Sequence, residues 1–133
     1  MPFSTYMDNK ILDEFFGKVD YTPVATLYVA LSTTAPTKGA TNITEPTGNA
    51  YARVAVTNNT TNFPTASNST KNNGSVVTFA EATGLWGTVT NWLIYDALTG
   101  GNMLAYGTLT NSKTIDVGDT PSFNTNSLTL TLS

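Results

Sequence analysis

The sequence predicts a mainly β fold: a single-domain antiparallel β-sandwich or jelly roll with one short N-terminal α-helix. Apolar and polar residues alternate with a period of two in several short runs, most clearly in 88–95 and 127–133. Clusters of Gly, Pro, Asn and Thr separate these runs, as turns do between strands. One segment, 4–17, carries apolar residues at helical spacing instead. With 133 residues, the chain is predicted to form one domain over 1–133.

The N-terminal helix is predicted over residues 4–17. Met7, Ile11 and Phe15 recur four residues apart, which places them in one stripe along a helix. Ser4 is a suitable N-cap residue. A helix of this kind usually closes one end of a β-domain, and less often it docks onto a partner.

The strongest strand signal is a central hairpin from Trp86 to Thr110, with its reversal at Thr99-Gly100-Gly101-Asn102. Apolar residues on both faces of 92–95 indicate either a strand that is covered on both sides or a strand with one end at an interface. The alternation predicts one face of Val89, Asn91, Leu93 and Tyr95 and an opposite face of Thr90, Trp92, Ile94 and Asp96.

Other short runs bring the predicted strands to about seven. They are 24–32, 51–57, 75–79, 113–117 and 127–133. Within the second of these, Val54 and Val56 are predicted to point inward and Arg53 outward.

Two long polar loops, 33–49 and 58–74, interrupt this pattern. Loops of such length are uncommon in compact domains and tend to be functional or mobile. Ile43 is the single candidate core residue of the first loop, and Phe63 breaks the polarity of the second. The second loop is either a solvated surface segment or an extended arm that Phe63 anchors to a neighbour.

The composition excludes several classes of function. Six Lys and Arg stand against nine Asp and Glu, for a net charge of −3, so the clustered cations that neutralise nucleic-acid phosphates are missing. There is no Cys and no His, which removes thiol catalysis, thiolate metal sites and His-dependent triads. No apolar run reaches the roughly 20 residues that span a bilayer. No signal-peptide pattern is present, so synthesis in the cytoplasm is expected.

The carboxylates and aromatic residues allow three weaker hypotheses of chemistry. Glu81 and Asp96 are a conceivable glycosidase pair, but Asp96 precedes a hairpin turn, where Asp is common. Asp116 and Asp119 lack the ligand density of a calcium loop. The remaining hypothesis is a sugar-stacking platform of Trp86, Trp92, Tyr95 and Tyr106, against which core packing is favoured. We therefore predict no catalytic, cofactor-binding or metal-binding residues.

Several segments together carry a resemblance to a known family. They are VATLYVALSTTAPT after the helix, EPTGNAYARVAV, the long segment from Phe79 to Phe123, and the closing SLTLTL. In this order they resemble a family of small structural proteins of tailed bacteriophages, which includes capsid cement, decoration and fibre-like proteins. The loop 58–74 departs from the resemblance.

The resemblance implies a non-enzymatic virion protein. Its preferred form is a capsid cement or decoration protein that lies on the capsid surface, bridges major capsid protein subunits and stabilises the head. Such a protein acts as a dimer or trimer and gains strength by multivalency. The alternative is a tail or fibre component, and a carbohydrate-binding module is a third reading. Neither nucleic acid nor membrane is expected as a partner.

Seven apolar residues are the candidate interface residues. They are Met7, Ile11 and Phe15 in the helix, Ile43 and Phe63 in the two long loops, and Leu85 and Trp86 in the tip before the central hairpin.

Overall fold

The computed structural model describes residues 3–132; it is mainly β, with antiparallel sheets and one short helix, which confirms the predicted fold class. The elements are α1 (Thr5–Phe15), β1 (Thr26–Ser32), β2 (Val54–Thr57), β3 (Thr70–Asn72), β4 (Val77–Thr78), β5 (Gly87–Tyr95), β6 (Met103–Ile115), β7 (Ser122–Phe123) and β8 (Thr129–Thr131). The first two residues of the predicted domain and the last, 133, lie outside the described residues.

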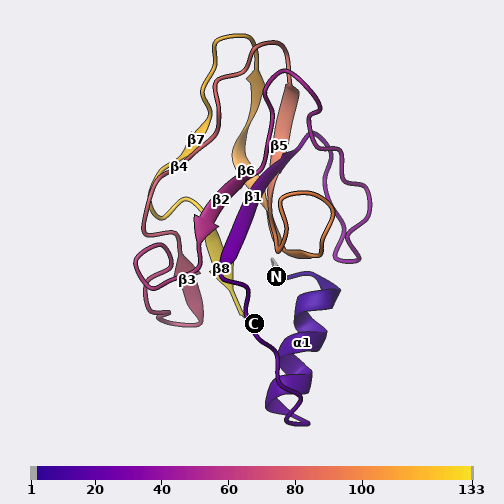
Figure 1. Cartoon of the computed structure of the whole chain (residues 1–133), viewed down its shortest axis with the longest axis vertical. Coiled ribbons are helices and arrows are strands. Elements are labelled where there is room, and N and C mark those ends of the chain that lie inside the picture. Colours follow the sequence, from indigo (N-terminus) through magenta and orange to yellow (C-terminus); the bar gives the residue numbers. More distant parts are fainter. Residues whose placement is uncertain (1–2, 133) are drawn as a thin grey trace.

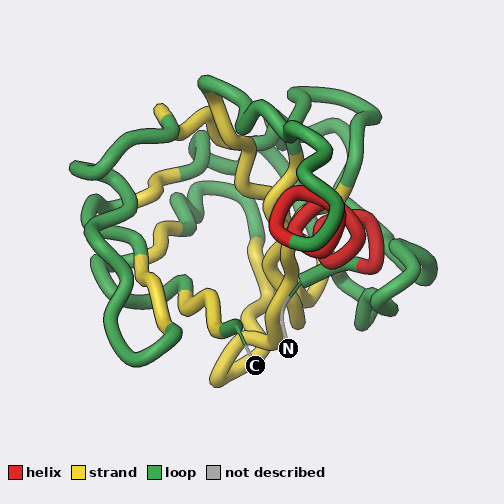
Figure 2. Tube along the Cα trace, turned by 90° about the horizontal axis from the view of Figure 1, so that it is seen from below, coloured by secondary structure: helices red, strands yellow, loops and turns green. Residues whose placement is uncertain are grey.

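Three sheets make up the β structure. The largest has four strands in the order β2-β1-β5-β6, and the pairs β3-β8 and β4-β7 form two small sheets. All pairings are antiparallel. Viewed end-on, the small sheets face the large one across the domain, and α1 lies outside the strands (Figure 2). This layered arrangement is compatible with a jelly roll.

The main core lies between the large sheet and the small ones. β1 and β5 contribute alternate residues to it, and the small sheets and their loops supply the other side. Its buried members include Val29, Leu31, Val77, Phe79, Trp86, Trp92, Ile94 and Leu128. Burial of this apolar surface is the main force that holds the layers together.

Strand β5 is buried on both faces, as predicted. All five residues 91–95 are buried. On the face away from the main core, Leu93 and Tyr95 form a second cluster with Ala30 and Met103, and Ile43 of the first long loop packs against it. The first long loop therefore helps to cover the face of the large sheet that no other sheet covers.

The start of β5 differs from the predicted alternation. Val89 belongs to the main core together with Trp92 and Ile94, whereas the period of two places it on the opposite face. The reason is a shift of register with β6 between Val89 and Asn91. Over this step β5 advances two residues and β6 advances five, so the ladder is irregular here and the side-chain alternation of β5 is broken.

The central hairpin and its turn are confirmed. Gly100 and Gly101 both have positive φ, at 60° and 72°. Asp96 holds the turn, since its carboxylate accepts hydrogen bonds from the backbone N–H of Asn102 at 2.7 Å and from its side-chain amide at 3.0 Å. The return strand is longer than predicted, because β6 continues through the residues between the two strands expected over 103–110 and 113–117.

Neither long loop is free of structure. Loop 33–49 is tied by its own hydroxyl and amide groups: Thr34 Oγ1 donates to the Asn42 carbonyl at 2.7 Å, and the Asn42 amide donates to the Ala35 carbonyl at 2.8 Å. Loop 58–74 contains β3, whose partner β8 comes from the chain's end. The strand predicted over 75–79 is reduced to the two residues of β4.

The helix does not close the end of the domain, which corrects the usual expectation for such a helix. Its N-cap is Ser4, as predicted, and Ser4 Oγ accepts from the Met7 N–H at 3.1 Å. None of its residues is buried. It projects beyond the strands at one end of the molecule (Figure 1). Backbone bonds from Ser4 to Leu104 and from Thr5 to Lys38 attach its first turn to the domain.

We predict that Gly107→Ala lowers the free energy of unfolding by about 1–3 kcal/mol, because a core without room must shift to admit a new methyl group. A Cβ at this position of β6 would lie 2.6 Å from Nε1 of Trp92, its partner across the sheet. Urea denaturation measures the change. Gly39→Ala is the control, since its Cβ would meet nothing closer than 3.9 Å. Equal stability of both variants would contradict the tight packing of Trp92 on β6.

Candidate interaction surfaces

The carboxylates proposed for chemistry serve turns. Asp96 caps the central hairpin as described above. Asp119 Oδ2 accepts from the Asp116 N–H at 2.8 Å, and Asp116 Oδ1 accepts from the Val117 N–H at 2.7 Å. Glu81 lies exposed in a loop. Within residues 3–132, no three His, Cys, Asp or Glu side chains gather closely enough to hold a metal ion.

Arg53 forms an enclosed charged site on the face of the sheet away from the main core. Val54 and Val56 pack against that core and Arg53 points away from it, as predicted, but the outer face is covered here rather than open to solvent. Its side chain is 7% exposed, and it binds the Glu45 carboxylate through Nε at 3.1 Å and Nη2 at 2.8 Å. Nη1 donates to the carbonyls of Ala97 and Gly100 at 2.8 and 2.9 Å. The guanidinium lies 3.6 Å from the centroid of the Tyr95 ring. Arg53 thereby joins the first long loop, β2 and the hairpin turn.

Tyr51 extends this cluster toward the sheet. Its hydroxyl donates to Glu45 Oε1 at 2.7 Å and accepts from the Leu31 N–H at 3.1 Å. Burial raises the pKa of the Tyr51 phenol far above its usual range, and the hydrogen bond to Glu45 raises it further. Burial alone would lower the pKa of Arg53, but the hydrogen bonds and charge of Glu45 outweigh it and the pKa is raised. Tyr51 therefore stays a neutral phenol that donates to Glu45, and Arg53 stays a cation.

The four aromatic residues considered as a sugar platform do not form one. Trp86 and Trp92 are each 5% exposed and belong to the main core. Tyr95 and Tyr106 belong to the cluster on the opposite face of the sheet. The Trp86 indole N–H donates to the Asn49 carbonyl at 2.8 Å, as a buried indole requires.

The seven candidate interface residues fall into three groups. Phe15 and Leu85 are exposed, at 74% and 57%. Met7, Ile11 and Ile43 are half-buried. Phe63 and Trp86 are each only 5% exposed, so in the single chain they offer little surface to a partner. Phe63 anchors its loop to its own domain rather than leaving it as a free arm.

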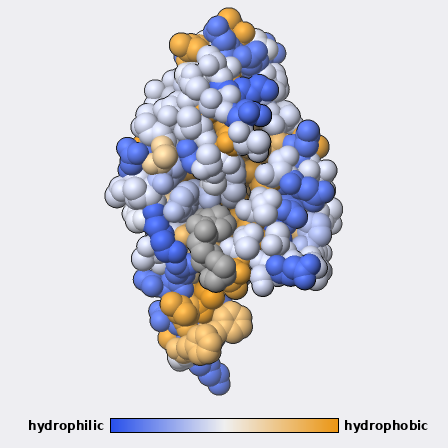
Figure 3. Space-filling model, turned by 180° about the vertical axis from the view of Figure 1, so that it is seen from behind, coloured by the Kyte–Doolittle hydropathy of each residue, from blue (hydrophilic) through white to orange (hydrophobic). Residues whose placement is uncertain are grey.

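Four of the nine large hydrophobic residues that are exposed in the described part of the chain lie at the far end of α1 and in the turn that follows it. We call them the helix patch: Leu12, Phe15, Phe16 and Val19, which are 54%, 74%, 82% and 58% exposed. The space-filling view shows hydrophobic residues gathered at this end of the molecule, apart from the polar surface of the strands (Figure 3). A cluster of this kind at a protruding tip is typical of a surface that contacts another molecule.

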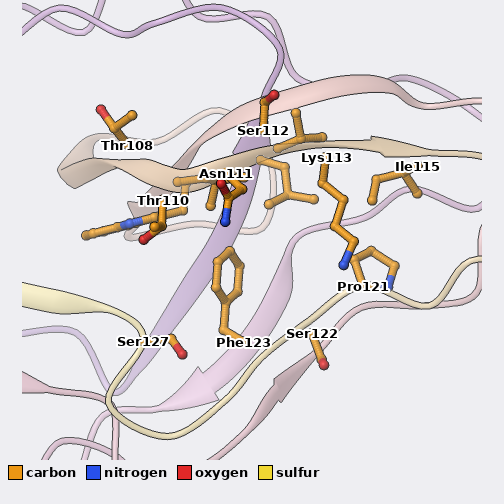
Figure 4. A pocket seen from close by; sticks show the side chains of 14 residues that line it. Thr108, Thr110, Asn111, Ser112, Lys113, Ile115, Pro121, Ser122, Phe123 and Ser127 are labelled. Carbon is orange, nitrogen blue, oxygen red and sulfur yellow. The ribbon is translucent and has the colours of Figure 1, made fainter.

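A second feature is a groove of about 420 Å³ between β6 and β7, which we call the β6–β7 groove. Trp92, Leu109 and Phe123 contribute apolar atoms to it, and Thr, Asn and Ser residues of β6 form much of its rim. In the close view, Phe123 rises into the groove from one side, and Lys113 reaches down from the other (Figure 4). Sequence patterns did not reveal this groove, because β7, which forms one side of it, was not predicted as a strand.

The comparisons with known proteins place the chain among small structural proteins of tailed-phage virions. The family model that matches is described as Podophage GP4 fiber I protein gp80, and it covers residues 2–131. The chain belongs to this family. A search of curated proteins finds no match. In the described part of the chain, no helix has the length and apolar character needed to cross a bilayer.

We predict that Arg53→Ala lowers the free energy of unfolding by about 2–4 kcal/mol, because it leaves Glu45 without its partner in an enclosed site. The matched control is Lys38→Ala, which removes the partner of Asp8; the Lys38 side chain is 45% exposed, against 7% for Arg53, so its loss should cost less than about 1 kcal/mol. Guanidinium denaturation of both variants measures the difference. Similar small losses would show that the Arg53 cluster does not fasten the loop.

The same Phe-to-Ala change at two positions compares the stability contribution of a buried side chain with that of an exposed one. Phe63→Ala should lower the free energy of unfolding by about 3–5 kcal/mol through the cavity it leaves. Phe15→Ala should change it by no more than about 0.5 kcal/mol, because the side chain is largely in solvent. Thermal and urea unfolding report both values. A larger loss of stability for Phe15→Ala than for Phe63→Ala would show that Phe63 is not buried in the folded protein.

Proposed function

We propose that the chain is a non-enzymatic structural component of a phage fibre. The observation that carries the proposal is the family match, which extends over residues 2–131 and names a fibre protein. It favours the fibre alternative over the preferred sequence-based reading of a capsid cement protein. The capsid surface and the major capsid protein as a partner remain predictions of that earlier reading.

The polar groups of the fold support a structural role. The carboxylates at 96, 116 and 119 hold turns. The enclosed charges of Arg53 and Glu45 fasten a loop. The surfaces that suit contact with other virion proteins, including further copies of this chain, are the apolar helix patch and the β6–β7 groove with its polar Thr, Asn and Ser residues.

Location in the particle tests the proposal. Antibodies against the purified protein should label fibres in negatively stained virions, and quantitative mass spectrometry should count few copies per particle. Heads freed of tails should lack the protein. Label spread over the shell, at a copy number that matches the capsid lattice, would favour the cement reading and overturn this one.

A further inference from the structure

The helix patch is acidic at its edges. Over residues 10–20, which contain the patch, three carboxylates (Asp13, Glu14 and Asp20) outnumber two cations (Lys10 and Lys18), and the last turn of α1 has no basic residue. The C-terminal end of a helix also carries the negative pole of its dipole. A complementary surface for this patch is therefore an apolar hollow with a positive group at its rim.

The β6–β7 groove of the same chain has these properties. Its apolar lining is described above, and Lys113 is the one charged residue among those that line it. Lys113 is exposed, and its side chain reaches into the groove (Figure 4). The rim residues Thr110, Asn111 and Ser112 are exposed and uncharged, so they add no repulsion toward the carboxylates of α1.

We propose that the helix patch of one copy docks into the β6–β7 groove of the next copy. This proposal rests on the proposed function and deepens it by naming the chain's own second copy as a partner. The two surfaces are different parts of the molecule, so the contact is heterologous, and repetition gives a ring if the rotation closes or an open row if it does not. Pairing two helix patches instead would bring like charges together, which is unfavourable.

The size of the patch sets the strength of a single contact. Phe15 and Phe16 together expose on the order of 300 Å², given the usual area of an aromatic side chain and their exposed fractions. Even with Leu12 and Val19 added, the exposed apolar area of the patch stays below the roughly 800 Å² that each partner buries in a standard interface. One contact is therefore weak, and repetition along an assembly makes it strong.

Two variants that each disable one side of the contact provide the test. The helix variant is Phe15→Ser with Phe16→Ser, and the groove variant is Asn111→Glu with Lys113→Glu, all at exposed positions. Sedimentation velocity is run at about 0.5 mM, a concentration suited to weak contacts. The wild-type protein should associate, and each variant alone should associate at least about tenfold more weakly. Leu98→Ser, at an exposed apolar residue of the hairpin turn, is the matched control and should associate like the wild type.

Mixing the two variants gives the decisive result. The intact patch of the groove variant meets the intact groove of the helix variant, so the mixture should form heterodimers that do not grow further. A monomeric wild type, a groove variant that still associates fully, or a mixture without heterodimers would each overturn the proposal. Circular dichroism verifies that the variants are folded. Because no virion is present, this result is independent of where antibodies locate the protein in the particle.

Discussion

The double burial of β5 is the constraint on which the rest of this structure depends. A strand that is apolar on both faces needs two covers. The small sheets supply one of them by packing on Trp92 and Ile94. The other face, with Leu93 and Tyr95, is covered by a loop without strands, which the Arg53–Glu45 cluster holds in place. The hydrogen bonds of this cluster thus keep a loop packed over a face of β5 that a second sheet covers in an ordinary β-sandwich.

Sequence patterns predicted well those elements whose conformation is set by one local rule. Period-two alternation identified β1 and β5, and the Ser4 cap set the start of α1. The short strands β3 and β7 were missed because their Thr, Asn and Ser residues are equally common in turns. Val89 was misplaced because the register of β5 and β6 shifts beside it. The enclosure of Arg53 was missed because its partner, Glu45, is not part of any local pattern.

The interaction surfaces were only partly predictable, because local sequence patterns do not show which residues meet in the folded chain. An amphipathic stripe looks alike whether it packs on its own domain or on a neighbour, so Phe15 could be proposed but not assigned. Phe63 in its polar loop gave the same signal and proved to be buried. The β6–β7 groove depends on which strands end up as neighbours, and this is fixed by the whole topology rather than by any one segment.

The weak attachment of α1 has a consequence for assembly. The helix has 11 residues and buries none of them, and isolated helices of this length are marginal in water. Its order therefore comes largely from the backbone hydrogen bonds that attach its first turn to Leu104 and Lys38, and the exposed ion pair between Asp8 and Lys38 adds little. Any neighbour that covers the far end stabilises the helical state by mass action. In the proposed assembly, helix formation and subunit contact would be linked equilibria, because a neighbour that covers the apolar end also favours the helical state over local unfolding.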